Sequence, residues 1–282
     1  MTTSTVRDVH AVTPAVGAVI TGVDLRAPLD DNTARAIRDA VLEHGVVFFR
    51  DQDLTREQML VFMERFGTPC TDPFSVDQSI SGLDTIIDMV TLGYSPATAV
   101  WHIDSSLAAA PASLIALRAL EVPASGGDTC WASMYAAYDA LSEPLRNLLD
   151  GLTAEHAGRK TLALMGGDSY GFLREDMRNV HPAVRVHPET GRKALFVDEL
   201  WTERIVELAP DESASLLAFL FEHVKKPNFT VRWHWRQHDL ALWDNRAFQH
   251  YAVNDYTTNR VMQKSLLAGD RPYGPAHRNQ GG

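Results

Sequence analysis

Short apolar segments, each bounded by glycine, proline or polar turn residues, recur along most of this chain of 282 residues. In one of them, Phe229, Val231, Trp233 and Trp235 alternate with polar residues, as in a strand with one buried face. Strands are expected at 16–25, 46–49, 85–90, 112–120, 130–132, 183–187, 194–197, 229–235, 240–243 and 260–268. So many short strands predict a fold that is mainly β, of the double-sheet jelly-roll type.

Helical periodicity is confined to a few segments. Asp31 or Asn32 is expected to cap a helix that ends near Gly45, and Thr55 to Gln58 resembles a capping box that opens a second helix. Further helices are expected within 134–152 and from Pro210 onward. The stretches 68–100 and 157–179 lack periodicity and are candidate lids. Without a linker or repeat, residues 1–282 are predicted to form one domain with helical additions.

Composition excludes several functional classes. The formal net charge is −10, and no basic face is visible, which argues against nucleic acid as the main partner. No apolar run approaches the length of a membrane span, and the N-terminus lacks the apolar core of a secretory signal. Only Cys70 and Cys130 are present, so a reducing cytoplasm is expected. A cytoplasmic enzyme acting on a small molecule is the favoured class.

A candidate metal site begins at Trp101-His102-Ile103-Asp104. If this segment ends a strand, His102 and Asp104 point to the same face. A third ligand is available in His250, far along the chain, and a jelly roll brings its strands back to one open end. Two histidines and one carboxylate form the facial arrangement of non-haem iron(II) oxygenases. The alternative is that His102 is a partly buried structural histidine and His250 a surface one.

Arg260, ten residues after His250, suggests an anion site beside the metal. A buried arginine can hold a carboxylate in a bidentate pair, which the far carboxylate of 2-oxoglutarate requires. Thr129 could add a hydroxyl to the same carboxylate. The alternative for Arg260 is a surface ion pair with an acidic neighbour.

Motifs inside and outside the candidate site are shared with a known family. Around the site they are Trp101-His102-x-Asp104, Gly126-Gly127-Asp128-Thr129, Trp243-Asp244-Asn245-Arg246-x-x-Gln249-His250-Tyr251-Ala252 and Arg260-Val261-Met262. Elsewhere they include Thr21-Gly22-Val23-Asp24-Leu25, Ala154-Glu155-His156, His187-Pro188-x-x-Gly191 and Lys226-Pro227-x-Phe229-x-Val231-Arg232-Trp233. In this order, from about Val16 to Pro272, the chain resembles the taurine/2-oxoglutarate dioxygenase family.

The resemblance implies a double-stranded β-helix (jelly roll) and an iron(II) site of His102, Asp104 and His250. It also implies 2-oxoglutarate and O2 as co-substrates, with 2-oxoglutarate held by Arg260 and Thr129. The reaction would release succinate and CO2 and oxidise a substrate C–H bond. The carboxylate of Asp104 favours hydroxylation, because relatives that halogenate lack it; desaturation and ring formation stay open. A homodimer or homotetramer fits the resemblance.

The substrate pocket departs from the family pattern. Lys264 stands where taurine enzymes place a sulfonate-binding arginine, and it offers only a point charge. In the loop after Gly67, Asp72 and Ser75 replace a histidine and a tyrosine. Before Trp101, Ala97 and Thr98 replace the polar residues expected to bind the taurine amine. Other candidate substrate residues are Thr161, Leu162 and Trp201. For Lys264 and Asp72 the alternative is a solvated or mutually paired charge, and for Trp201 a core position.

These residues favour an iron(II)- and 2-oxoglutarate-dependent oxygenase of a small polar or amphipathic molecule other than taurine. Another sulfonate, a sulfate ester, an amino-acid derivative or an intermediate of secondary metabolism would fit. One alternative is a true taurine or alkylsulfonate dioxygenase that uses Lys264. The other is a sensor that binds metal and 2-oxoglutarate without turnover.

Overall fold

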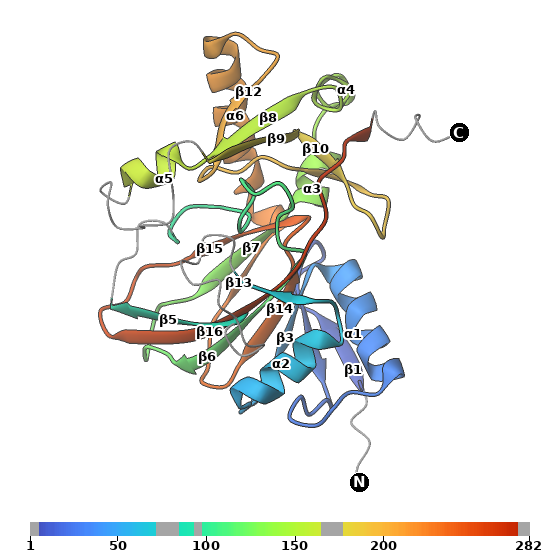
Figure 1. Ribbon diagram of the computed structural model, residues 1–282, viewed down its shortest axis with the longest axis vertical. Helices are drawn as coiled ribbons and strands as arrows, with labels where there is room; N and C mark the ends of the chain where they lie inside the picture. Colours follow the sequence, from blue (N-terminus) through green and yellow to red (C-terminus); the bar gives the residue numbers. More distant parts are fainter. Residues whose placement is uncertain (1–5, 72–84, 93–97, 165–176, 276–282) are drawn as a thin grey trace.

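The computed structural model of the chain describes residues 6–71, 85–92, 98–164 and 177–275 (Figure 1). These residues form a mainly β structure with helices around it, as the sequence predicts. Asp72, Ser75 and Ala97 lie outside the described residues, as does most of the candidate lid within 157–179. Among the described helices, none has both the length and the apolar character needed to cross a membrane.

The largest sheet has eight strands in the described part of the chain. Its order is β1-β2-β3-β14-β6-β16, and β4 and β5 share the outer edge of β16. All neighbours are antiparallel except β2 and β3. The strands are β1 (Asp8–Ala11), β2 (Ala18–Thr21), β3 (Val46–Phe49), β4 (Pro69–Cys70), β5 (Ile86–Leu92), β6 (Leu114–Glu121), β14 (Leu240–Asp244) and β16 (Asn259–Leu267).

A three-stranded antiparallel sheet packs against one face of this large sheet. Its order is β13 (Thr230–Trp233), β7 (Thr129–Ser133) and β15 (Phe248–Ala252). Phe48 of β3 stacks on Trp233 at 3.9 Å between ring centroids and meets Trp131 edge to face at 5.4 Å. Such aromatic contacts bury large apolar areas, so the core between the two sheets is built on them.

Residue alternation in β14 shows that the two faces of the large sheet contribute side chains to two different hydrophobic cores. Ala241 and Trp243 face the core between the sheets, whereas Leu240 and Leu242 face the opposite side. The helices α1 (Asp31–His44) and α2 (Arg56–Glu64) cover that opposite side with their apolar faces. Both faces of β14 are therefore buried, which explains its continuous apolar sequence.

The helix ends follow the sequence closely, with one correction. The capping residue of α1 is Asp30, which accepts a hydrogen bond from the Thr33 amide at 2.8 Å; the prediction of Asp31 or Asn32 is wrong by one or two positions. The Thr55–Gln58 capping box is confirmed. Gly45 ends α1 with φ of 78°, and a Cβ there would lie 2.0 Å from the Phe248 ring. Only glycine satisfies both conditions.

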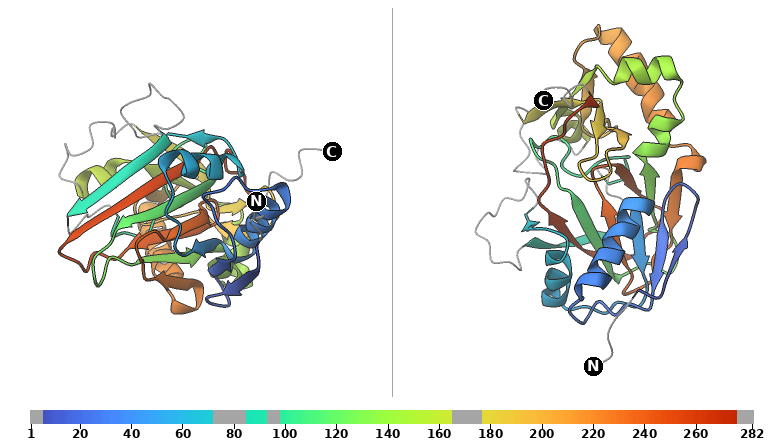
Figure 2. Two further views of the ribbon diagram at one scale, coloured as in Figure 1. Left: turned by 90° about the horizontal axis from the view of Figure 1, so that it is seen from below. Right: turned by 90° about the vertical axis from the view of Figure 1, so that its right-hand side faces the viewer.

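Most of the remaining elements gather at the end of the molecule away from α2, as Figure 2 shows, and the β10–β11 connection reaches back to α1, where Glu189 pairs with Arg38. The remaining elements comprise the sheet β12-β8-β9 and the hairpin β10-β11, together with four helices and a short 3-10 turn. Their bounds are β8 (Thr153–Ala157), β9 (Arg178–Pro182), β10 (Val184–Val186), β11 (Lys193–Leu195), β12 (Thr202–Ile205), α3 (Met134–Asp139), α4 (Glu143–Leu149), α5 (Arg159–Leu164), α6 (Pro210–Val224) and η2 (Pro227–Phe229).

Several strand predictions need correction. The segment 101–104 does not end a strand; His102 makes one isolated bridge, to His250. The predicted strand 16–25 is only β2, because Gly22 takes a φ of 82° and turns the chain. The sequence does not predict the two-residue strand β4, nor β1, β8, β9, β12 and β15. The strands β8, β9 and β15 carry the buried histidines His156, His181 and His250, and β1 is exposed along its length, so apolar alternation does not reveal them.

Candidate metal centre and active site

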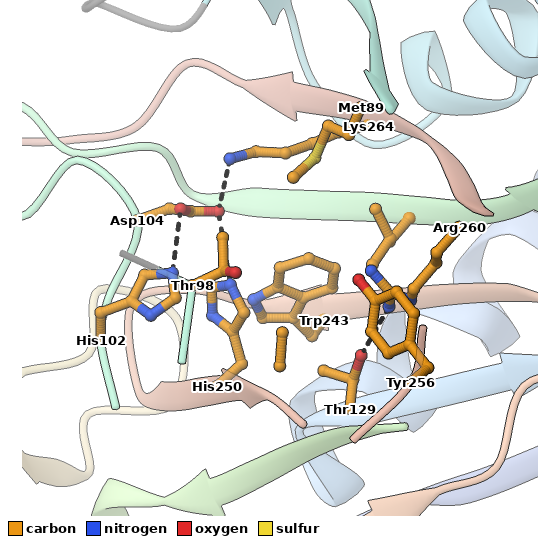
Figure 3. Close-up of a pocket in the computed structure, with 12 residues that line it drawn as sticks. Met89, Thr98, His102, Asp104, Thr129, Trp243, His250, Tyr256, Arg260 and Lys264 are labelled. Carbon is orange, nitrogen blue, oxygen red and sulfur yellow. Dashed lines mark hydrogen bonds and ion pairs between the residues drawn. The ribbon is translucent and has the colours of Figure 1, made fainter. Parts of the chain in front are cut away.

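A cavity lies between the two sheets, and its lining comes from both of them (Figure 3). His102, Asp104 and His250 lie at one end, and Arg260 and Thr129 at the other. The lining residues are Met89, Thr98, His102, Asp104, Leu117, Thr129, Trp243, His250, Ala252, Tyr256, Arg260 and Lys264. Residues far apart in the sequence thus converge on one buried space.

Backbone pairing brings the two histidines together. The His102 amide donates to the His250 carbonyl at 3.1 Å, and the His250 amide donates to the His102 carbonyl at 2.9 Å. This reciprocal pair puts the two side chains on one face, with 4.1 Å between their ring centroids. The spacing of the imidazoles is therefore set by main-chain hydrogen bonds.

Asp104 is fixed by the side chain of Asn245, in the turn between β14 and β15. The amide oxygen of Asn245 accepts from the Asp104 N–H at 3.0 Å, and its nitrogen donates to the carbonyls of Asp104 and Ala112 at 3.0 and 2.9 Å. Ser105 follows with φ of 53°, a left-handed conformation that a residue with a Cβ rarely adopts. The turn that precedes His250 thus also holds the segment that carries Asp104.

The donor atoms of these three residues suit a divalent metal ion. One ligand atom from each lies within 4.8 Å of the others. Nε2 of His102 is 3.6 Å from Asp104 Oδ1, and Nε2 of His250 is 3.8 Å from Asp104 Oδ2. His102 Nδ1 lies 2.7 Å from the Val100 carbonyl, which can only accept, so Nδ1 carries the proton and Nε2 presents its lone pair. A histidine oriented in this way is typical of metal ligands.

Electrostatics favour the ligand forms of two of these groups. Burial would raise the pKa of Asp104, but Lys264 and the two histidines hold it well below its usual range. Lys264 Nζ is 2.9 Å from Asp104 Oδ2. Burial, aided by His102, lowers the pKa of His250 well below its usual value. Asp104 is therefore ionised and His250 neutral, as metal binding requires.

The opposite end of the cavity holds a preorganised cation. Arg260 is buried, and its Nε donates to the Gly127 carbonyl at 3.0 Å while Nη2 donates to Thr129 Oγ1 at 3.2 Å. Burial lowers the pKa of Arg260, and Tyr256 and Asp128 oppose that shift. Because a guanidinium stays protonated in proteins, this end of the cavity suits an anionic group.

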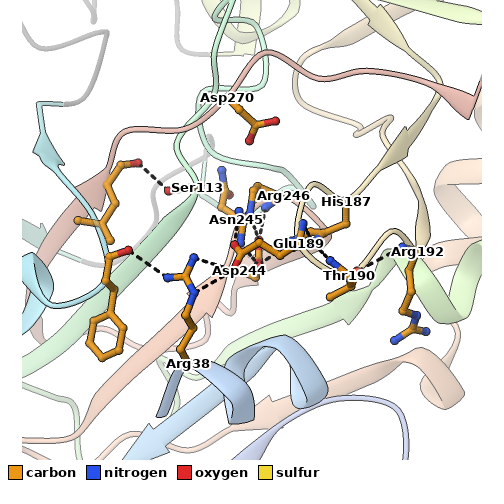
Figure 4. A network of polar contacts seen from close by, with 12 residues as sticks. Arg38, Ser113, His187, Glu189, Thr190, Arg192, Asp244, Asn245, Arg246 and Asp270 are labelled. Atoms are coloured by element: carbon orange, nitrogen blue, oxygen red, sulfur yellow. Dashed lines mark hydrogen bonds and ion pairs between the residues drawn. The ribbon is translucent and has the colours of Figure 1, made fainter. Parts of the chain in front are cut away.

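A buried ionic network supports the turn between β14 and β15 from behind (Figure 4). Asp244 accepts from Arg246 Nε at 2.8 Å and Nη2 at 2.6 Å, and it lies 2.9 Å from His187 Nε2. Glu189 links Arg246 to Arg38 of α1, each at 2.7 Å. Burial raises the pKa of Asp244, but Arg246 and His187 outweigh it, so its pKa is lowered. The network joins the turn to α1 and the β10–β11 connection.

The other predicted substrate residues divide into two groups. Thr98 and Lys264 line the cavity. Leu162 and Trp201 instead pack in a small apolar cluster with Leu107 and Leu200, and Thr161 donates to the Leu200 carbonyl at 3.2 Å. These three residues are not among those that line the cavity.

Sequence reasoning missed several residues of the site. Met89, Leu117 and Tyr256 line the cavity, and Asn245 positions Asp104. Asn245 belongs to the motif around His250 and could have been identified there. The apolar residues gave no signal that separates them from core positions.

A further cluster that the sequence did not reveal lies behind the metal end. Ser106 Oγ lies 2.9 Å from His156 Nδ1 and donates to Asp198 Oδ2 at 2.7 Å. All three side chains are fully buried, and burial raises the pKa of Asp198 to about 6. This cluster anchors the segment that follows Asp104.

Comparison with known proteins identifies the class. The profile of the taurine catabolism dioxygenase TauD, TfdA family matches residues 8–266, and the chain belongs to this family. The predicted class, a 2-oxoglutarate-dependent dioxygenase, is confirmed by this membership.

Three similar proteins illustrate the range within the family. An alpha-ketoglutarate-dependent sulfate ester dioxygenase of Pseudomonas putida is 38% identical over 95% of this chain and 91% of its own length. An alkylsulfatase of Acinetobacter baylyi is 36% identical over 92% and 84%. The crystal structure of a taurine dioxygenase from Burkholderia xenovorans matches with a TM-score of 0.83 and 37% identity, covering 95% of this chain and 91% of the other.

Proposed function

We propose that this chain is a 2-oxoglutarate-dependent dioxygenase of small organic sulfate esters. Iron(II) would be held by His102, Asp104 and His250, and the far carboxylate of 2-oxoglutarate by Arg260 and Thr129. The whole chain would form one domain, in which the two facing sheets make a double-stranded β-helix. The similarity to a sulfate ester dioxygenase and an alkylsulfatase supports this substrate class.

The charge inventory of the cavity carries the proposal. Among the lining residues in the described part of the chain, Asp104 contributes one negative charge, and Lys264 and Arg260 contribute one positive charge each, a net charge of +1. A divalent ion would raise the net charge of the cavity from +1 to +3. Dianionic 2-oxoglutarate leaves one positive charge, which a monoanionic sulfate ester neutralises. Zwitterionic taurine would leave that charge uncompensated, and unpaired charge in a buried site is unfavourable.

The residues that line the cavity have different roles in the proposed reaction. When bound, iron and 2-oxoglutarate activate dioxygen, with 2-oxoglutarate leaving as succinate and CO2 and one oxygen atom passing to the substrate. Lys264 faces the substrate anion, and Thr98 contributes to the wall on that side. Trp243 and Leu117 exclude water between the two ends. Hydroxylation at the carbon that bears the ester oxygen makes the product collapse to a carbonyl compound and free sulfate.

Product analysis tests this assignment. With iron(II), ascorbate and 2-oxoglutarate, we expect linear alkyl sulfates to yield succinate and sulfate in equal amounts, whereas taurine and amino-acid derivatives yield little. His102→Ala should abolish both products. His223→Ala is the matched control, because His223 is also buried and one of its ring nitrogens also meets a carbonyl outside the site: Nε2 lies 2.8 Å from the Ala137 carbonyl. Faster turnover of taurine than of any sulfate ester would overturn the proposal.

A further inference from the structure

The hydroxyl of Thr129 receives two hydrogen bonds. Trp235 Nε1 donates to Thr129 Oγ1 at 2.9 Å, and Arg260 Nη2 donates to the same oxygen at 3.2 Å. An indole N–H and a guanidinium are donors only, so the direction of both bonds is unambiguous. Thr129 and Trp235 are 1% and 3% exposed, so water does not compete for these contacts.

Two accepted hydrogen bonds determine what Thr129 can still do. A hydroxyl has two lone pairs and one hydrogen, and both lone pairs are engaged here. No described residue accepts the Thr129 hydrogen in a hydrogen bond, and Thr129 lines the cavity. Toward a bound molecule Thr129 is therefore a donor and not an acceptor.

We propose that Trp235 is a positioning residue that makes Thr129 an obligate donor and so selects a carboxylate, which only accepts, over a primary amide, whose NH2 group only donates, at this end of the co-substrate. The inference rests on the proposed function, since it concerns the far carboxylate of 2-oxoglutarate. It assigns a role to a residue that does not line the cavity and has no predicted part in binding.

The surroundings hold both donors in place. Trp235 follows β13, and the last residue of that strand, Trp233, pairs with Thr129 in β7. The centroid of the Trp235 ring lies 6.2 Å from that of the Trp131 ring. Arg260 is fixed by its bond to the carbonyl of Gly127, which has a φ of 70°; a Cβ there would lie 2.9 Å from Pro123 and 3.3 Å from Arg260. The orientation of Thr129 is thus established before any ligand binds.

Trp235→Phe tests the role, because it removes the N–H and keeps an aromatic ring. In calorimetric titrations of the Mn(II)-loaded protein we expect the Kd for 2-oxoglutarate to rise about threefold to tenfold, the range for one hydrogen bond. Trp131→Phe is the matched control, since Nε1 of Trp131 is buried without a hydrogen-bond partner among the described residues. That control should leave the Kd unchanged.

A second ligand separates this role from general packing. The analogue of 2-oxoglutarate whose far carboxylate is a primary amide presents N–H groups that a donor-only Thr129 cannot accept. The ratio of the amide Kd to the 2-oxoglutarate Kd should therefore be large in the wild type and fall in Trp235→Phe, where one Thr129 lone pair is released. Benzothienylalanine at position 235 keeps both fused rings without the N–H and should lower the ratio in the same way.

The outcomes are distinct. A ratio that stays at the wild-type value in both position-235 variants overturns the inference. A wild-type protein that binds neither ligand with metal present overturns the proposed function instead. Thr129→Val supplies a further check, because replacing Trp235 in that background should have no additional effect on the ratio if the indole acts through Thr129.

Discussion

Asn245→Ala tests whether the turn before His250 controls metal binding. The substitution removes three hydrogen bonds, to the Asp104 N–H and to the carbonyls of Asp104 and Ala112. At about 1 kcal/mol for each bond, the free energy of unfolding should fall by about 3 kcal/mol, so the variant is less stable than the wild type. Asp104 would also lose its fixed position, and loss of such a supporting contact lowers metal affinity about 10- to 100-fold.

Gln52→Ala provides a control with the same number and kind of bonds. Gln52 accepts from the Leu25 amide at 2.9 Å and donates to the carbonyls of Val23 and Arg50 at 3.3 and 2.9 Å. Its own amide donates to the His238 carbonyl, before β14, whereas Asn245 follows the other end of that strand. Both variants should lose similar stability in urea unfolding, and only Asn245→Ala should lose affinity in Mn(II) titrations. Equal Mn(II) affinity in the two variants would refute the reasoning.

Three further changes are expected to have separable effects. Lys264→Ala should raise KM for alkyl sulfates about tenfold to a hundredfold, the range for a hydrogen bond to a charged group, and Lys264→Arg should restore the wild-type KM. Initial rates of sulfate release measure this KM. An unchanged KM in Lys264→Ala would exclude Lys264 from substrate binding. Burial lowers the pKa of His181 from 6.5 to about 4, so the unfolded chain binds a proton over this interval and the folded protein does not. Stability should fall by about 3 kcal/mol as the pH drops through that window, and His181→Gln should flatten the loss in unfolding experiments at stepped pH. Glu189→Gln weakens the link between Arg246 and Arg38 and should lower the melting temperature without changing the Kd for 2-oxoglutarate; a change in that Kd would show that the network reaches the anion end.

Much of the fold could be predicted because its apolar strands follow simple patterns. The strand at 46–49, the capping box at Thr55 and the alternation before Trp233 each appear where the sequence indicates. The strand β15 was missed because Gln249, His250 and Tyr251 are polar or amphipathic, although two of the three are buried. Polar residues that line a site lie in the interior without apolar alternation, so periodicity does not detect them.

The candidate site was predictable in its residues but not in its supports. Family motifs indicate His102, Asp104, His250 and Arg260, and the structure gathers them around one cavity. The relation of Trp235 to Thr129 depends on which indole edge meets which hydroxyl, and it requires coordinates.

The reciprocal hydrogen bonds between His102 and His250 have a consequence for how such a protein can diversify. The two imidazoles belong to residues that are paired directly by main-chain hydrogen bonds. Chain segments before and after this pair can therefore lengthen, shorten or change composition without altering the distance between the two imidazoles. A one-residue slip, in contrast, would turn one imidazole to the opposite face. The distance between the two imidazoles is thus independent of the length of more distant loops, whereas Asp104 still depends on Asn245 in the turn before His250.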